Sequence, residues 1–297
     1  MTMRTVRLAD WPHPVSALGF GCASLGSRVS RKVAAAAIER ALAAGINWFD
    51  VAPSYGDGEA EEILGDTLGG QTVAIVTKVG LRARPANRIA RVARRFARPV
   101  VSAFPKLRTV IRPIRAQAIE RIALDADSIH TSIARSLERL RVDRVAVLAL
   151  HEPALEDLRR DEVLRALEDV KRQGLAAHIG IAGSFASFTV ANDARPFIDV
   201  AQFELSSSGR CGAEIRAVAA RNAFAVMYGV FGAKGPEASR LSLRHAFGAN
   251  PSGVVLASSF APAHLAANVA AASETPDRVL AGEIERSLGS EGVPDNR

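Results

Sequence analysis

The sequence predicts an α/β fold, a closed (β/α)8 TIM barrel with a parallel eight-stranded core. Short apolar runs alternate along the chain with amphipathic helical stretches. The apolar runs lack a polar face, which is typical of a parallel sheet covered by helices on both sides. Eight such units need about 250 residues, and the chain has 297. A doubly wound open sheet is the competing arrangement.

Eight segments have the composition of buried strands. They are Val15–Cys22, Ile46–Val51, Thr72–Val79, Arg144–His151, Ala177–Ala182, Val200–Leu205, Phe224–Val230 and Gly253–Ser258. Helical patterns between them include Arg31–Ala44, Glu59–Leu68, Ser128–Leu140, Asp161–Gln173 and Ala263–Ala272. Gly45 and Gly174 directly follow two of these helical patterns, where a left-handed residue often ends a helix.

Three stretches depart from a plain repeat. Residues 81–127 form an insertion rich in Arg and Pro after the third strand, and residues 233–252 predict an irregular or shortened seventh helix. The tail from Thr275 ends in a loose polar segment. No linker divides the chain, so we expect one domain over residues 1–297.

Composition excludes several protein classes. The chain is 48% hydrophobic and 23% charged, which excludes wholesale disorder. No apolar run approaches the roughly 20 residues of a membrane-spanning helix, and the N-terminus lacks the apolar region of a secretory signal. Cys22 and Cys211 are too few and too far apart for a disulfide framework or a zinc site. We therefore expect a cytoplasmic domain of enzyme size with reduced cysteines, and no metal site.

The net charge of +7 comes from one segment. Residues 82–121 hold twelve Lys and Arg against Glu120 alone, so this segment contributes +11 and leaves −4 for the rest. Such a distribution does not predict a nucleic-acid-binding face. The segment is either a solvated loop, or a lid or contact for an acidic substrate, carrier protein or membrane surface.

Four polar residues lie where catalytic groups occur in such barrels, at the carboxyl ends of strands or in the following loops. Asp50 ends the second strand, Tyr55 follows it, Lys78 lies near the end of the third strand and His151 ends the fourth. Because Asp50 and Lys78 lie on neighbouring strands, their side chains can pair. A structural ion pair, a core histidine and a loop-covering tyrosine are the alternative interpretations, but together they would require four coincidences.

This set of side chains suits the protonation of a carbonyl. A tyrosine titrates near pH 10, and a neighbouring lysine ammonium is expected to lower its pKa. Asp50 would keep Lys78 charged, and His151 could orient the carbonyl oxygen by a hydrogen bond. The hydride for the carbonyl carbon must come from a cofactor.

These residues resemble the aldo-keto reductase family. The resemblance rests on DVAPSYGDGEAEEILG (50–65), TKVG (77–80) and SLERLRVDRVAVLALHEP (136–153), with later echoes at 174–183, 200–206 and 225–232. It runs from about residue 15 to 272. It implies a nicotinamide-dependent reductase in which Tyr55 is the general acid/base, Lys78 and Asp50 tune it, and His151 orients the carbonyl.

The resemblance also implies a cofactor site. The candidate cofactor-binding residues are Gly21, Cys22, Asp50, Ser184, Gln202, Tyr228, Gly229, Phe231, Gly232, Ser258, Ser259 and Asn268. The chain has Ala182 and Gly183 where relatives commonly carry Ser and Asn, and Phe260 where they often carry an Arg for the 2′-phosphate. NADPH is the expected cofactor, with NADH as the alternative.

The substrate is expected to be a small carbonyl compound or the matching alcohol. Two other functions remain open: a non-catalytic, cofactor-sensing or scaffolding barrel that acts through the basic insertion, and a biosynthetic step in which that insertion receives a charged or carrier-bound substrate.

Gly19, Gly21 and Ser24 approach a dinucleotide-binding G-x-G-x-x-G motif, but the third glycine is missing, so the motif is a weak signal.

Overall fold

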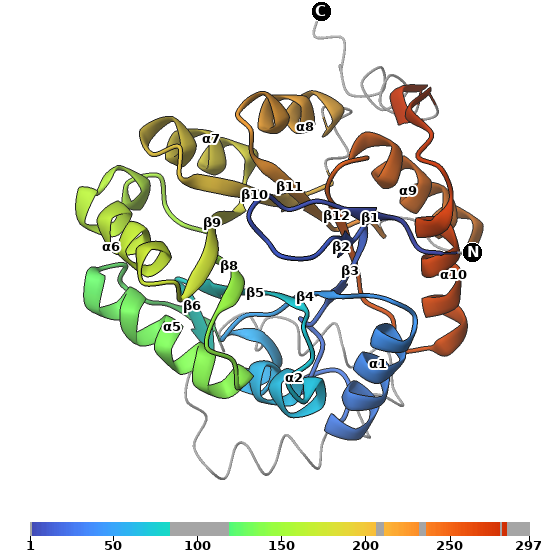
Figure 1. The fold of residues 1–297 in the computed structure, drawn as a ribbon, viewed down its shortest axis with the longest axis horizontal. Coiled ribbons are helices and arrows are strands. Elements are labelled where there is room, and N and C mark those ends of the chain that lie inside the picture. The colour runs from blue at the N-terminus through green and yellow to red at the C-terminus, as the bar shows by residue number, and fades with distance from the viewer. Residues whose placement is uncertain (1, 84–118, 206–210, 232–235, 280, 284–297) are drawn as a thin grey trace, which may run out of the picture.

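Eight parallel strands close into a barrel in the computed structural model (Figure 1). The structure describes residues 2–83, 119–205, 211–231, 236–279 and 281–283. Around the barrel the strands are β3 (Leu18–Gly21), β4 (Trp48–Asp50), β5 (Ala74–Val79), β8 (Val145–His151), β9 (Ala176–Gly183), β10 (Ile198–Glu204), β11 (Phe224–Tyr228) and β12 (Val254–Ala257). β12 pairs with β3, so the sheet has no open edge and the predicted barrel is confirmed over the open sheet.

A ring of helices surrounds the barrel (Figure 1). These are α1 (Arg31–Ala43), α2 (Ala60–Leu68), α5 (Ala126–Leu140), α6 (Asp161–Arg172), α7 (Phe185–Ala194), α8 (Cys211–Ala220), α9 (Pro236–Ala249) and α10 (Pro262–Ser273). Short 3-10 helices span Tyr55–Gly58 and Asp157–Arg159. α7 and α8 follow the fifth and sixth predicted strands, where eight βα units require helices, although the patterns named above do not include their ranges. Gly45 and Gly174 have positive φ, as expected of residues that end helices.

Each outer helix turns an apolar stripe to the barrel. In α5, Ile129, Ile133, Leu137 and Leu140 are buried at helical spacing. Asp125 caps the start of this helix by accepting from the Ser128 backbone N–H at 2.8 Å. The first turn is therefore fixed by sequence as well as by packing.

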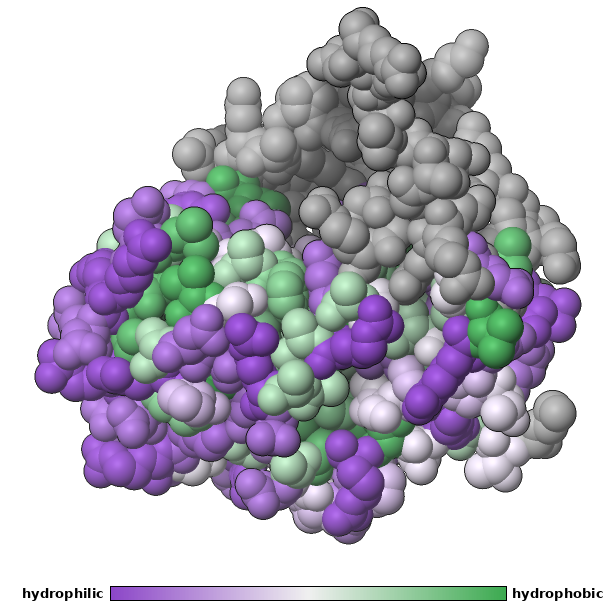
Figure 2. Space-filling model, turned by 90° about the horizontal axis from the view of Figure 1, so that it is seen from above, coloured by the Kyte–Doolittle hydropathy of each residue, from purple (hydrophilic) through white to green (hydrophobic). Residues whose placement is uncertain are grey.

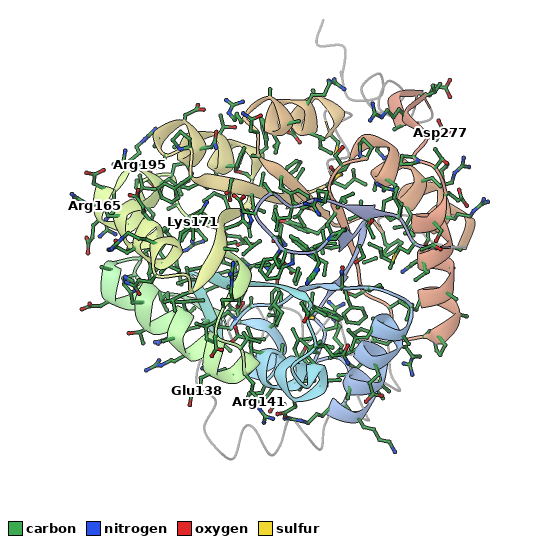
Figure 3. All side chains as sticks on the ribbon, viewed as in Figure 1. Glu138, Arg141, Arg165, Lys171, Arg195 and Asp277 are labelled. Atoms are coloured by element: carbon green, nitrogen blue, oxygen red, sulfur yellow. The ribbon has the colours of Figure 1, made fainter. Side chains whose placement is uncertain are left out.

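Charged side chains point outward from this ring. Glu138, Arg141, Arg165 and Arg195 lie at the periphery in Figure 3, whereas Lys171 points inward to Asp199 of β10, at 2.9 Å. The coloured part of the face in Figure 2, seen from above the view of Figure 1, is hydrophilic mainly at its edges and has hydrophobic residues toward its middle. None of the helices in the described residues is long and apolar enough to cross a membrane.

The predicted first strand is divided in two. β2 (Val15–Ser16) pairs antiparallel with β1 (Thr5–Val6), and the chain enters the barrel at Leu18. Asn47 holds this junction, because its side-chain oxygen accepts from the Ser16 N–H at 2.6 Å. The sequence pattern could not separate the two pieces, since every residue in them except Gly21 is buried.

The prediction of an irregular or shortened helix within residues 233–252 is wrong. α9 has 14 residues and buries Leu243, Ala246 and Phe247 against the barrel. Gly248 lies within α9 at a point of close packing. A Cβ at this position would lie 2.3 Å from the Asp277 carbonyl oxygen.

The insertion begins and ends as an antiparallel hairpin. β6 (Leu81–Ala83) pairs with β7 (Ile119–Arg121), while residues 84–118 lie outside the described part of the chain. Gly80 joins β5 to the hairpin with φ +119°, a conformation that favours glycine. The N–H of Ile122, just after β7, donates to the Gly80 carbonyl at 2.9 Å, so the insertion starts and ends at one point.

Candidate active site

A buried ion pair lies at the carboxyl ends of β4 and β5. Lys78 Nζ donates to Asp50 Oδ1 at 2.7 Å and to the Val51 carbonyl at 3.1 Å. The Lys78 and Asp50 side chains are 1% and 4% exposed. Burial alone would lower the pKa of Lys78, but Asp50 and then Tyr55 outweigh it and raise that pKa. Lys78 is therefore a fixed cation.

Contacts on the opposite side of β5 fix the part of the strand that carries Lys78. Thr77, the preceding residue, donates to Glu61 Oε1 of α2 at 2.7 Å. The other oxygen of Glu61 accepts from Arg139 of α5 at 3.0 Å, and the Glu61 side chain is fully buried. Successive residues of a strand point to opposite sides, so this contact anchors the strand while Lys78 faces the site.

Tyr55 completes this chain of contacts. It begins the 3-10 helix Tyr55–Gly58, and its hydroxyl lies 3.3 Å from Lys78 Nζ. The ammonium also lies 4.8 Å from the centre of the phenol ring. The three side chains from two strand ends and the following turn thus form one hydrogen-bonded series, as the sequence predicts.

The expected direction of the Tyr55 pKa shift is wrong. Lys78 does lower the pKa of this phenol, but burial raises it more, and Asp50 adds to the rise. The net pKa lies above the ordinary value of 10. Tyr55 therefore keeps its proton at neutral pH, as a proton donor requires.

His151 faces Tyr55 across the site. The two rings meet edge to face, with centroids 5.7 Å apart. Burial, followed by the charges of Lys78 and Arg121, lowers the pKa of His151 to about 3. Its imidazole is therefore neutral at physiological pH and has one N–H to donate. His151 Nδ1 is buried and has no hydrogen-bond partner in the described residues.

These four side chains line one cavity of about 990 Å³. Six of the predicted cofactor residues besides Asp50 also line it: Gly21, Gln202, Tyr228, Gly229, Phe231 and Ser258. Strand register explains the grouping, because Gly21 lies beside Asp50, His151 beside Ala182, and Ala182 beside Gln202. The carboxyl ends of the strands thus meet at one rim.

Two oxygen atoms of residues that line the cavity accept no hydrogen bond from the described residues. Gln202 Oε1 and Asp50 Oδ2 are buried without a hydrogen bond in the described residues. A carboxamide N–H suits the first atom, and a sugar hydroxyl suits the second. The Tyr228 ring lines the same wall. Burial, then Glu204 and Glu152, raise the Tyr228 pKa to about 12. These groups fit a nicotinamide nucleoside.

Small residues leave room beside these groups. Gly21, Ala182 and Ala257 line the cavity, and a Cβ at Gly21 would lie 2.8 Å from Ser258 Oγ. Ser258 Oγ donates to the Gly21 carbonyl at 2.5 Å, which joins the ends of β3 and β12. At Gly229, with φ +73°, a Cβ would lie 2.6 Å from Glu204 Cγ. A larger residue at either glycine would displace this wall.

Other predicted cofactor residues do not line the cavity. Cys22 is fully buried. Ser184 caps α7, where its hydroxyl accepts from the Ser187 N–H at 3.0 Å, so it is already engaged. Ser259 donates to the Ala261 carbonyl at 3.3 Å. Asn268 is buried on α10, and Gly232 lies outside the described residues.

The cavity also has residues that sequence reasoning missed. Arg28, Leu81, Ile119, Arg121 and Glu152 line it. Arg121 is one of many arginines in the basic insertion, and the sequence gives no signal that separates it from the others. In the described residues, no group of three or more His, Cys, Asp and Glu side chains could hold a metal ion.

Known proteins share this sequence and architecture. The model of the Aldo/keto reductase family matches residues 17–208. The chain is 33% identical over 183 residues to D-threo-aldose 1-dehydrogenase from a Pseudomonas species, a match that covers 58% of this chain and 51% of that protein. The chain spans about half the length of the curated relatives it matches.

Solved structures give the same picture of the fold. An aldo-keto reductase from Bacillus halodurans, in its holo form, is similar with a TM-score of 0.75 and 21% identity over 99% of both chains. An aldo-keto reductase from Klebsiella pneumoniae in complex with NADPH is similar with a TM-score of 0.71 and 18% identity, covering 100% of this chain and 98% of that one.

Proposed function

This chain belongs to the aldo/keto reductase family, and from that premise we propose that it is a nicotinamide-dependent oxidoreductase that reduces an aldehyde or ketone to an alcohol, or catalyses the reverse. The observation that carries the proposal is the hydrogen-bonded series Asp50–Lys78–Tyr55 facing His151 across one cavity.

Tyr55 is the proposed proton donor. Its raised pKa keeps the hydroxyl protonated at neutral pH, so it can transfer its proton to the oxygen of a bound carbonyl. The phenolate that remains would lie beside the Lys78 ammonium, which stabilises the new negative charge. Asp50 balances and positions Lys78.

His151 is the proposed orienting group. Because its imidazole is neutral, its N–H can donate a hydrogen bond to the same carbonyl oxygen without competing for the proton. A charged imidazolium beside Lys78 would be costly in this buried site. The neutral form therefore suits both the substrate and the neighbouring cation.

A nicotinamide cofactor, when bound, supplies the hydride that the carbonyl carbon accepts. Gln202 and Asp50 would hold its carboxamide and ribose through their unpaired oxygens, and Tyr228 would lie against the ring. NADPH is the proposed cofactor, since a solved relative is a complex with it. NADH is the alternative, because Phe260 replaces the usual arginine.

The relatives widen the range of substrates to test. The curated relative described above is named as a dehydrogenase of D-threo-aldoses, so sugars belong in the screen beside aldehydes and ketones. No specific observation favours the non-catalytic, scaffolding alternative over the enzyme, because the four proposed catalytic side chains are intact.

Titration of the purified protein with NADPH and, separately, with NADH tests this proposal. We expect saturable binding in the micromolar range, seen as a change in nicotinamide fluorescence, and turnover of at least one aldehyde, ketone or sugar. A well-folded protein that binds neither cofactor contradicts the proposal and favours the scaffolding function instead.

A further inference from the structure

The hairpin β6–β7 gives the active-site cavity a wall with one cationic residue. Leu81 pairs with Arg121, and Arg82 with Glu120, so Leu81, Ile119 and Arg121 share a face. All three line the cavity. Arg82 and Glu120 lie on the opposite face and form an ion pair.

The guanidinium of Arg121 lies at the rim beside His151. Its Nη1 donates to the carbonyl of Glu152, the residue that directly follows His151. A guanidinium has five N–H donors, and this is the one hydrogen bond that the Arg121 side chain makes within the described residues. No carboxylate of the described chain pairs with it, whereas Arg82 of the same hairpin is paired.

The charges around the cavity favour an anion. Asp50 and Lys78 neutralise each other within the buried pair. Arg28 also lines the cavity and, like Arg121, has no carboxylate partner in the described residues. Against these two arginines, the cavity wall formed by the described residues has one further carboxylate, that of Glu152, and Glu204 lies near enough to help raise the pKa of Tyr228. The positive charges of Lys78 and Arg121 act on His151: burial is the largest cause of its lowered pKa, and these two charges lower it further.

We propose that the substrate carries an anionic oxygen group, a carboxylate or a phosphate, and that Arg121 binds it while the carbonyl lies between Tyr55 and His151. Leu81 and Ile119 would cover the carbon chain that links the two groups. This inference rests on the proposed function and names the substrate class of that same site. A guanidinium suits both anions because its N–H groups match two oxygens at once.

Paired substrates that differ in charge test the inference. The pairs are 4-carboxybenzaldehyde with methyl 4-formylbenzoate, and D-glyceraldehyde 3-phosphate with D-glyceraldehyde. Steady-state rates with NADPH are measured for the wild type, R121Q and R121K. R82Q is the matched control, because it removes a charge from the same hairpin on the face away from the cavity.

We expect the wild type to favour the charged member of at least one pair. R121Q should then lower kcat/KM for that member by about 10- to 100-fold, mainly through KM, because a hydrogen bond to a charged group is lost. Rates with the neutral members should change by less than about twofold in the same comparison. R121K should retain part of the preference, and R82Q all of it. The pair that shows the larger loss identifies carboxylate or phosphate.

Four results would overturn the inference. Equal losses for charged and neutral substrates in R121Q would mean that Arg121 only supports the Glu152 backbone. An equal effect of R82Q would assign the preference to the basic segment as a whole. Turnover of neutral aldehydes without any charge preference would reject the anionic substrate and leave the proposed function intact, whereas a wild type inactive on every substrate would reject both.

Discussion

The two sides of the barrel mouth differ in how their polar groups are satisfied. On the side of β4 and β5, Asp50, Lys78 and Tyr55 form a continuous series of hydrogen bonds. On the side of β9 and β10, Gln202 is buried with its oxygen unpaired, and Ala182 contributes no polar group. On the first side the protein's own side chains thus hold one another, although Asp50 Oδ2 is left without a hydrogen bond in the described residues, whereas on the second side the buried oxygen of Gln202 has no protein partner among them at all.

This difference shows where rigidity is built in. A buried network with its partners in place holds its geometry before substrate arrives, which is the condition for efficient transition-state stabilisation. A buried acceptor without a partner costs free energy that a ligand can restore. Substitutions on the first side should therefore affect the rate, and those on the second side the cofactor affinity.

Removing the Tyr55 hydroxyl interrupts the hydrogen-bonded series at β4 and β5 and should have the largest effect on the rate. We expect Tyr55→Phe to lower kcat by roughly 10²- to 10⁴-fold, because the proton donor is lost. The dissociation constant of NADPH should stay within about twofold, since Gln202 and Tyr228 are untouched. Stopped-flow turnover and fluorescence titration measure the two quantities. Retained turnover would assign the proton transfer to another group.

The pH profile of reduction tests the protonation states of Tyr55 and His151. Tyr55 must be protonated to act as an acid, and its pKa is raised, so kcat/KM should fall about tenfold per pH unit only above about pH 10. His151 has a pKa of about 3, so it stays neutral and adds no titration between pH 5 and 8. A midpoint near pH 6.5 would show that His151 titrates in the working enzyme.

Gln202→Leu probes the second side. The leucine removes the unpaired buried oxygen, so the melting temperature should stay the same or rise. The dissociation constant of NADPH should increase by roughly three- to tenfold, the value of one hydrogen bond. Differential scanning calorimetry and titration give the two readouts. Unchanged affinity would place the carboxamide elsewhere.

Ser184→Ala should have the smallest effect on function. Ser184 caps α7 in the structure, so the substitution should lower the free energy of unfolding by about 1 kcal/mol. Cofactor affinity should stay within about twofold, in contrast to Gln202→Leu. Urea unfolding and titration compare the two variants. A loss of cofactor affinity as large as that of Gln202→Leu would show that Ser184 contributes to cofactor binding.

Much of the barrel and its reactive centre is readable from sequence. Apolar runs without alternation predict parallel strands, and strand ends share a rim, so Asp50, Lys78 and His151 must converge. Tyr55 follows from the short turn after β4. These predictions rest on local patterns that the closed sheet preserves.

Other features depend on packing that no local pattern records. The net direction of the Tyr55 pKa shift follows from how burial competes with Lys78, which requires the depth of the phenol. Ser184 stays a predicted cofactor ligand, but its role as the cap of α7 follows from where that helix begins, which the sequence pattern does not give. Arg121 differs from its neighbours only through the register of the hairpin.

The hydrogen bond between Ile122 and the Gly80 carbonyl has an evolutionary consequence. Because the chain departs and returns at one point beside β5, the segment between can be lengthened, shortened or exchanged without shifting any barrel strand. The entropic cost of a longer loop grows only slowly with its length. Since the base of this segment carries Arg121, an exchange here would replace the proposed anion-binding residue and leave Asp50, Lys78 and Tyr55 in place.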